Sequence, residues 1–157
     1  MKVKRIFIAV LVILLAGTFG YVYGKDTAKG KSSAKAQAKE MVVKAEAFVK
    51  ENGKEKAIAE FNKPEGQFVK DYFYVFAYDL TGTVIAHPHR PSLLGKNVID
   101  EPDSKGKLFR KEIVEQAKAK GEGWVEYKYM NPTTKKEKSK TTYFKKVGDM
   151  IICCGAY

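Results

Sequence analysis

Residues 72–86 are YFYVFAYDLTGTVIA and carry the strongest structural signal in the chain. The segment YFYVFAY at 72–78 is aromatic or apolar at both alternating sets of positions, which is typical of a central strand covered on both sides. The segment DLTG at 79–82 predicts a turn, and residues 83–86 predict a second strand. The stretch therefore predicts a β-hairpin within the interior of a sheet.

Helical sequence precedes this hairpin. Residues 34–50 contain no Pro or Gly, and their apolar side chains recur every three or four positions, which predicts a helix with one buried stripe. Asn52-Gly53 predicts the end of this helix, and residues 54–62 predict a shorter helix that ends before Pro64 and Gly66.

The rest of the chain supplies one more helix and three more strands. Residues 107–120 predict a helix that Gly121 closes, and residues 123–130, 139–147 and 150–156 predict strands. Together these elements predict an α+β domain, in which helices pack against a five-stranded, mainly antiparallel sheet. The strands hold more aromatic side chains than one sheet face needs against a helix, so we expect a pocket on the other face.

The first 24 residues have the pattern of an export signal. Lys2, Lys4 and Arg5 precede the apolar stretch IFIAVLVILLAGTFG at 6–20, and a basic start before an apolar core is typical of a signal peptide. The usual small-x-small pattern of a cleavage site is imperfect here. An apolar stretch of about 18 residues can also span a bilayer. We expect a signal peptide or a membrane anchor at 1–24, a tether at 25–33, and a folded domain at 34–157 that is periplasmic or otherwise extracytoplasmic.

The chain is strongly basic, with a formal net charge of +11. The first 24 residues hold three of these charges and no acid, which leaves +8 for the remainder. In an exported protein, nucleic acid is not an expected partner. The excess could favour an anionic lipid, an acidic partner or an anionic ligand, or the lysines could simply keep the surface solvated.

The two cysteines, Cys153 and Cys154, are adjacent. Neighbouring cysteines rarely bond to each other because the small ring strains the peptide, and their spacing fits neither a CxxC redox motif nor a haem attachment site. We interpret them as small, buried strand residues. A vicinal or an intermolecular disulfide is the alternative.

No catalytic motif stands out, and we expect neither an enzyme nor a cofactor. The acidic residues Asp100, Glu101 and Asp103 could bind calcium, but their spacing does not match an EF-hand, and turn formation explains them. His87 and His89 could bind a metal, but no further ligand follows at a suitable spacing. We expect His87 to point into the domain as a hydrogen-bonding group and His89 to be exposed.

Residues 71–157 resemble the single-Cache sensor family through eight motifs in the family's order. In this chain the motifs are Asp79 with Gly82, Ala86-His87-Pro88, Gly95-Lys96-Asn97, Asp103 with Gly106-Lys107, Gly123-Trp124-Val125 with Tyr127, Pro132-Thr133, Lys140, and Gly155-Ala156-Tyr157. The chain departs from the family at Cys153-Cys154 and at Tyr129-Met130, where the family commonly has small apolar residues and a Trp-Pro pair.

The resemblance implies a PAS-like sheet behind a long N-terminal helix, and an extracytoplasmic domain that binds small molecules and catalyses nothing. It is closest to the stand-alone members, whose signal passes to a separate membrane-bound chemoreceptor or kinase. The expected ligand is a short organic acid or a similar anionic metabolite. The residues we expect to enclose it are Tyr74, Phe76, His87, Trp124, Tyr127, Tyr129, Lys140 and Tyr143.

Lys140 is the expected anchor of this site. It stands beside Thr141, Thr142 and Tyr143, and a cation next to hydroxyl groups suits a carboxylate. From composition alone the better interpretation is a surface lysine of a basic hairpin, exposed at the start of its strand, and the family resemblance favours the binding role. Two other functions stay open: an envelope protein that docks through its basic surface, and a redox or metal protein built on Cys153, Cys154 and His87.

The export signal makes a first prediction. Residues 1–33 fused to a reporter enzyme that is active only outside the cytoplasm should give activity, because the basic and apolar regions suffice for targeting. Replacing Lys2, Lys4 and Arg5 together with Gln should reduce it. A full-length protein found in the cytoplasm with its N-terminus intact would contradict export.

Overall fold

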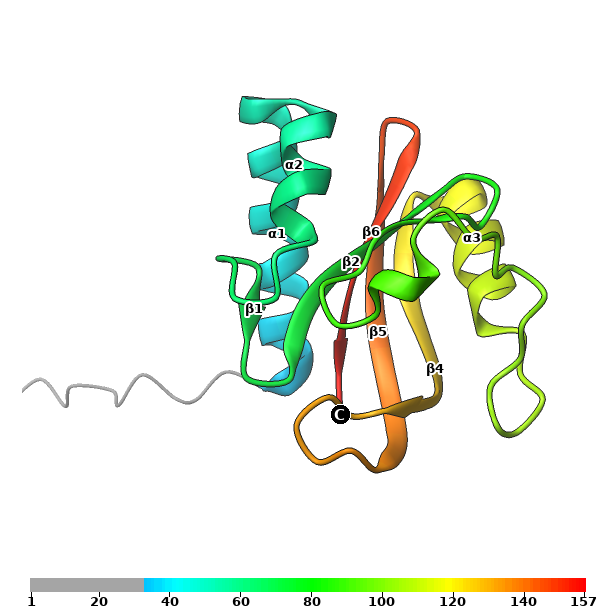
Figure 1. The fold of residues 1–157 in the computed structure, drawn as a ribbon. Coiled ribbons are helices and arrows are strands. Elements are labelled where there is room, and N and C mark those ends of the chain that lie inside the picture. The colour runs from blue at the N-terminus through cyan, green and yellow to red at the C-terminus, as the bar shows by residue number, and fades with distance from the viewer. Residues whose placement is uncertain (1–32) are drawn as a thin grey trace, which may run out of the picture. The chain divides into compact units, whose positions relative to one another are not determined.

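The computed structural model describes residues 33–157 (Figure 1). Helix α1 (Ala34–Asn52) begins after Ser33, whose hydroxyl accepts a hydrogen bond from the backbone N–H of Ala36. The helix ends at Gly53, whose φ of 83° is a conformation that favours glycine. Helix α2 (Lys54–Phe61) follows directly. The predicted export signal, and the tether up to residue 32, lie outside the described residues.

A six-stranded antiparallel sheet follows the two helices. Its strands are β1 (Val69–Lys70), β2 (Phe73–Asp79), β3 (Val84–Ala86), β4 (Glu122–Met130), β5 (Glu137–Val147) and β6 (Met150–Ala156). The strand order is β1-β2-β6-β5-β4, and β3 also pairs with β2. The predicted hairpin at 72–86 is confirmed, since β2 and β3 are antiparallel neighbours.

The α+β prediction is confirmed, but the sheet has six strands instead of five. The added strand, β1, is two residues that pair with the start of β2, too short for any alternation to be visible in the sequence. Between β3 and β4 the chain forms a short 3₁₀ helix (Pro91–Leu93) and helix α3 (Phe109–Lys120). Helix α3 begins two residues later than predicted.

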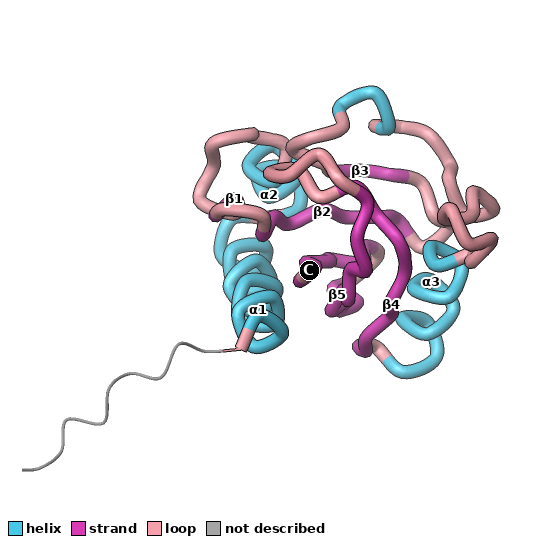
Figure 2. The backbone as a smooth tube through the Cα atoms, turned by 90° about the horizontal axis from the view of Figure 1, so that it is seen from below, coloured by secondary structure: helices cyan, strands magenta, loops and turns pink. Residues whose placement is uncertain are grey.

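Helices cover the sheet on both faces. Figure 2 shows α1 and α3 on opposite sides of the strands. Alternate residues of β2 separate into the two layers, with Val75 and Ala77 in the cluster against α1 and Tyr74, Phe76 and Tyr78 in the cluster on the other face. The central strand is therefore covered on both sides, as its unbroken apolar sequence predicts.

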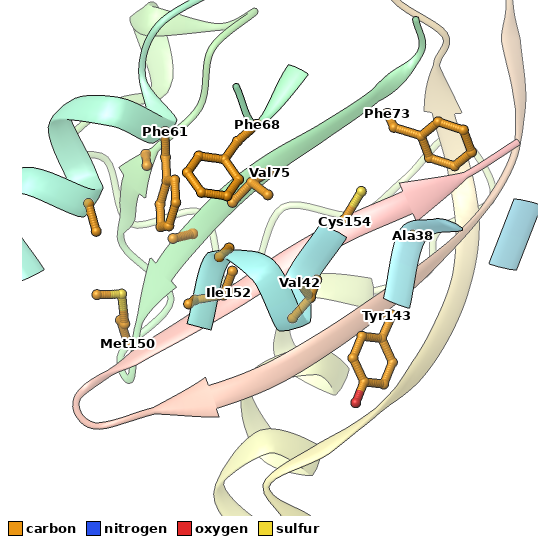
Figure 3. Packing of buried hydrophobic residues seen from close by; sticks show 14 of the residues in the cluster. Ala38, Val42, Phe61, Phe68, Phe73, Val75, Tyr143, Met150, Ile152 and Cys154 are labelled. Carbon is orange, nitrogen blue, oxygen red and sulfur yellow. The ribbon is translucent and has the colours of Figure 1, made fainter. Parts of the chain in front are cut away.

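The cluster against α1 is a close-packed apolar core. In Figure 3, Ala38 and Val42 of α1 lie over the sheet near Cys154 and Ile152, and Phe61 and Phe68 lie close together beside Val75. On the opposite face α3 contacts β4 and β5. The other end of that face, where β6 ends, lies under loops.

Both cysteines are fully buried and unbonded, which confirms their interpretation as small core residues. Because they are adjacent in β6, they point to opposite faces: Cys154 joins the α1 cluster and Cys153 the other. Burial raises the pKa of both thiols and keeps them protonated.

Replacement of both cysteines by alanine should therefore be tolerated. We expect the free energy of unfolding to fall by about 1–2 kcal/mol, because two buried sulfur atoms lose their packing contacts. Denaturant unfolding of the Cys153→Ala/Cys154→Ala variant measures this, and a reducing agent should leave the wild type unchanged. A wild-type protein that unfolds on reduction would show instead that a disulfide matters.

Candidate functional site

A lysine is buried within β5, on the face away from α1. Lys140 is 0% exposed, and its Nζ donates a hydrogen bond to Tyr74 Oη at 2.7 Å. Among residues 33–157, no carboxylate forms an ion pair with it. The expectation of an exposed lysine at a strand start is wrong, because β5 begins at Glu137 and Lys140 already lies inside the β4–β5 ladder, opposite Tyr127.

Aromatic rings surround the buried ammonium group. Its Nζ lies 4.2 Å from the ring centre of Tyr74, 4.9 Å from Phe76, 5.0 Å from Tyr129 and 5.3 Å from Tyr157. The negative faces of aromatic rings attract a cation, but they do not neutralise its charge. The protonated form of Lys140 is therefore desolvated, and Tyr74 Oη is its hydrogen-bonding partner among residues 33–157.

Gly155 provides the space that the lysine side chain occupies. A Cβ atom built at Gly155 would lie 2.0 Å from Lys140 Cε and 2.8 Å from Thr142 Oγ1. Real Cβ atoms do not approach other atoms so closely, so any larger residue here would displace the lysine. Glycine in a strand interior commonly marks such a close approach.

A cavity of about 330 Å³ lies next to this lysine. Its volume is near the lower limit for small-molecule sites, roughly 300–1,000 Å³. Tyr74, the hydrogen-bonding partner of Lys140, forms part of its wall. The full lining consists of Tyr74, His87, His89, Arg90, Tyr129, Met130, Pro132 and Lys135.

A larger hollow of about 510 Å³ lies on the opposite face, between α1 and the β1 region. The charged side chains that line it, Glu40, Lys44, Glu51 and Lys70, are all exposed. It therefore offers a ligand no charge that is sequestered from water. The smaller cavity beside Lys140 is the better candidate site because its neighbouring charge is buried.

His87 enters the cavity from the loop that follows β3. The side chain is 5% exposed, its backbone N–H donates to Asn62 Oδ1 at 2.9 Å, and its Nδ1 accepts the backbone N–H of His89 at 3.3 Å. Burial, together with the nearby charge of Lys140, lowers the pKa of His87 well below its usual range. The imidazole is therefore neutral. As predicted, His87 points inward and His89 is exposed.

Within residues 33–157, no three His, Cys, Asp or Glu side chains gather closely enough to hold a metal ion. A helix that is both long enough and apolar enough to cross a membrane is likewise not found in this part of the chain.

A sequence model described as a Cache domain matches residues 23–157. The chain belongs to the Cache domain family. The match includes the whole described fold, so the resemblance inferred from the eight sequence motifs is confirmed. Cache domains are sensory modules, and the PAS-like sheet with a long N-terminal helix is the architecture that this membership implies.

Three solved structures share this Cache fold. A methyl-accepting chemotaxis protein from Vibrio parahaemolyticus RIMD 2210633 has 27% identity and a TM-score of 0.67, with 78% of this chain and 87% of that chain covered. The periplasmic sensor domain of a chemotaxis protein has 21% identity and a TM-score of 0.63, covering 79% and 92%. A Cache chemosensory domain described for carboxylic acid recognition has 24% identity and a TM-score of 0.61, covering 78% and 86%. Among curated proteins, none matches the sequence.

Six of the eight residues expected to enclose a ligand lie on one face of the Cache sheet. Tyr74, Phe76, Tyr127, Tyr129 and Lys140 project from β2, β4 and β5 on the face away from α1, and His87 joins them from its loop. The four aromatic residues belong to or pack against one apolar cluster on this face. Lys140 lies over three of their rings, and His87 lies beside Tyr74 and Phe76. Of the six, Tyr74, His87 and Tyr129 line the cavity itself.

The structure does not bring Trp124 and Tyr143 into this group. They are partners in the β4–β5 ladder and both face α1, where Lys35 lies 5.7 Å from the Trp124 ring centre and Lys39 lies 5.1 Å from that of Tyr143. Figure 3 shows Tyr143 within the cluster against α1. The error is a single step in strand alternation, which moves a side chain to the opposite face.

Two hydroxyl groups on the site face are not among the eight residues expected to enclose the ligand. Thr142 Oγ1 lies 2.9 Å from Tyr127 Oη, and Tyr157 Oη donates to the backbone carbonyl of Met130 at 2.8 Å. Thr142 could have been found once Lys140 was placed, because residues two apart in a strand share a face. Tyr157 comes directly after β6, beyond the last position that alternation within a strand predicts.

The buried lysine makes a prediction about stability in the absence of ligand. Burial lowers the pKa of Lys140 from 10.5 to about 7. Above pH 7 the folded state therefore binds fewer protons than the unfolded state, so stability rises with pH. From pH 7 to 8.5 the wild type should gain about 1.5 kcal/mol relative to Lys140→Met, an apolar variant of similar length.

Denaturant unfolding at several pH values measures this difference. The range stops at pH 8.5 because the unfolded state then begins to lose protons from Cys and Tyr, whose folded pKa values are raised. Lys138→Met, at an exposed position in the same strand, should keep the wild-type slope. Parallel curves for the wild type and Lys140→Met would show that the lysine stays charged throughout.

Proposed function

We propose that this Cache domain is an extracytoplasmic sensor that binds a short organic acid and passes its signal to a separate membrane protein, a chemoreceptor or a kinase. The observation that supports the proposal is the buried ammonium group of Lys140, which has no carboxylate partner in the described chain. A buried charge without a counter-ion is costly, and an anionic ligand would reduce that cost.

The surroundings of Lys140 favour a carboxylate over a larger anion. Tyr74 Oη, 2.7 Å from Lys140 Nζ, can turn its proton toward a ligand oxygen while it accepts from the lysine. The wall beside it is aromatic, with Tyr74 and Tyr129 exposed to the cavity. A carboxylate would meet the cation and the phenol, and a short carbon chain would meet the rings.

Access to Lys140 requires a small movement. The lysine does not itself line the cavity, because the rings of Tyr74 and Tyr129 lie between. Tyr129 is only partly buried and holds its place through a hydrogen bond from the exposed Arg90. A ligand carboxylate would reach the ammonium group when the Tyr129 ring turns aside, so ligand binding and rearrangement of this wall would occur together.

The relatives support the same class of function. The similar Cache chemosensory domain is described for carboxylic acid recognition, and the similar Vibrio protein is a methyl-accepting chemotaxis protein. The similar periplasmic sensor domain also belongs to a chemotaxis protein, which fits the export signal expected here. Their shared fold supports an extracytoplasmic sensor, and the ligand assignment rests on Lys140.

The proposal predicts that Lys140→Met weakens binding of short acids. A charge-assisted hydrogen bond contributes roughly 1.5–3 kcal/mol, so the affinity should fall about 10- to 150-fold. Titration calorimetry with acetate, propionate and butyrate, preceded by a thermal-shift survey, measures the loss. Methionine keeps the volume of the side chain, so the fold should be retained.

Lys138→Met is the matched control, because Lys138 lies two residues earlier in β5 and is exposed. It should bind as the wild type does. If both variants lose affinity equally, and salt abolishes the loss, general surface charge attracts the acid and Lys140 is not the anchor. If no acid stabilises the wild type, the cavity is closed and the domain works through its surface instead.

A further inference from the structure

The cavity beside Lys140 has a second concentration of positive charge at its outer side. Arg90 and Lys135 both line it, and none of its lining residues is acidic. The two histidines in the lining add no negative charge either. A ligand in this cavity would therefore meet the exposed Arg90 and Lys135 directly, and the buried Lys140 once the Tyr129 ring turns aside.

Arg90 keeps most of its hydrogen-bonding capacity free for a ligand. Its Nη1 donates to Tyr129 Oη at 3.1 Å, and no carboxylate within residues 33–157 forms an ion pair with it. Glu101 raises the pKa of Arg90 slightly, after the larger effect of Tyr129, but the Glu101 side chain lies 3.8 Å from Arg110 Nη1. A guanidinium group has five N–H donors, and the Tyr129 bond uses one of them.

Lys135 is held at the cavity by the turn between β4 and β5. The buried Asn131 organises that turn: its Oδ1 accepts the backbone N–H groups of Thr133 and Thr134, and its carbonyl accepts the N–H of Lys135. Lys135 itself has a φ of 55°, an uncommon conformation for a lysine. These hydrogen bonds order the backbone of the turn and thereby set the position of the Lys135 Cα atom at the cavity.

The Tyr129 ring lies close to cations of both groups. The Tyr129 ring centre is 5.0 Å from Lys140 Nζ and 5.8 Å from the guanidinium carbon of Arg90. His89 lies near Lys135 and Lys140, since both charges, after burial, lower its pKa. Between these cations the wall is apolar, formed by Met130, Pro132 and the aromatic rings.

We propose that this cavity binds a short dicarboxylate, with one carboxylate at Lys140 and Tyr74 and the other at Arg90 and Lys135. The proposal rests on the function proposed above and specifies the ligand of that site. Two cationic ends separated by an apolar wall fit two carboxylates joined by a short carbon chain. The forked guanidinium geometry of Arg90 suits a planar carboxylate.

The test compares two acids with the same four-carbon chain, succinate and butyrate, which differ in the second carboxylate. Binding to the full domain is measured by calorimetry at fixed salt. Succinate should bind at least 10-fold more tightly than butyrate to the wild type. Arg90→Gln and Lys135→Gln should each weaken succinate about 5- to 10-fold, less than a buried charge-assisted bond because solvent screens exposed charges. Lys135→Gln should leave butyrate within twofold, and Arg90→Gln, which also removes the hydrogen bond to Tyr129, should lower the affinity for succinate more than that for butyrate.

Lys136→Gln is the matched control, because Lys136 is the exposed neighbour of Lys135 and does not line the cavity. It should change neither affinity. Lys140→Met should weaken both acids, which separates the inner subsite from the outer one. This pattern would support the dicarboxylate assignment.

Three results would overturn it. If succinate and butyrate bind equally and Arg90→Gln affects neither, the outer cations are not a subsite, although the sensor function stands. If Lys136→Gln weakens succinate as much as Lys135→Gln does, the effect is general surface charge. If inorganic phosphate binds as tightly as succinate and depends equally on Arg90 and Lys135, the outer cations recognise a phosphate. Failure of every acid to bind would instead overturn the proposed function itself.

Discussion

The structure of this Cache domain depends on how the amino group of one lysine is held inside it. Lys140 is buried among aromatic rings with one phenol as its hydrogen-bonding partner. The rings attract the ammonium group but leave it without a counter-charge, and burial lowers its pKa to about 7. The site thus carries an electrostatic cost that the rest of the fold must offset. The packed core between α1 and the sheet provides the compensating stability.

Much of the fold could be predicted because the sequence signals are local. The apolar segment at 72–78 shows a covered central strand, and Gly53 shows where the first helix ends. Residues 69–70 form a strand because they pair with the start of β2. Two residues are too few to show an alternating pattern, so this strand could not be predicted from the sequence. The family motifs identified the Cache fold as a whole.

The site was harder to predict because the middle of β5 is buried on both faces. In a strand with one polar face, alternation tells which side chains share a surface. Residues 142–144 are all buried, whichever face they lie on, so Tyr143 could not be assigned to the α1 side from sequence. The sequence gives no sign that Lys140 is buried either, because it follows other lysines in a segment that is typical of a solvated hairpin. Gly155 was the available clue, because a glycine within a strand often makes room for a neighbour.

Strand β6 separates the two halves of the molecule by the thickness of one backbone. Cys153 and Gly155 face the side where Lys140 lies, whereas Cys154 faces α1 and its sulfur lies 3.7 Å from that of Met41. Close-packed interiors transmit small displacements because they contain few voids to absorb them. A movement of Lys140 against Gly155 would therefore be transmitted to helix α1 through the adjacent residue, Cys154. Strand β6 thus couples the face of the sheet that carries the candidate site to the face that packs against α1.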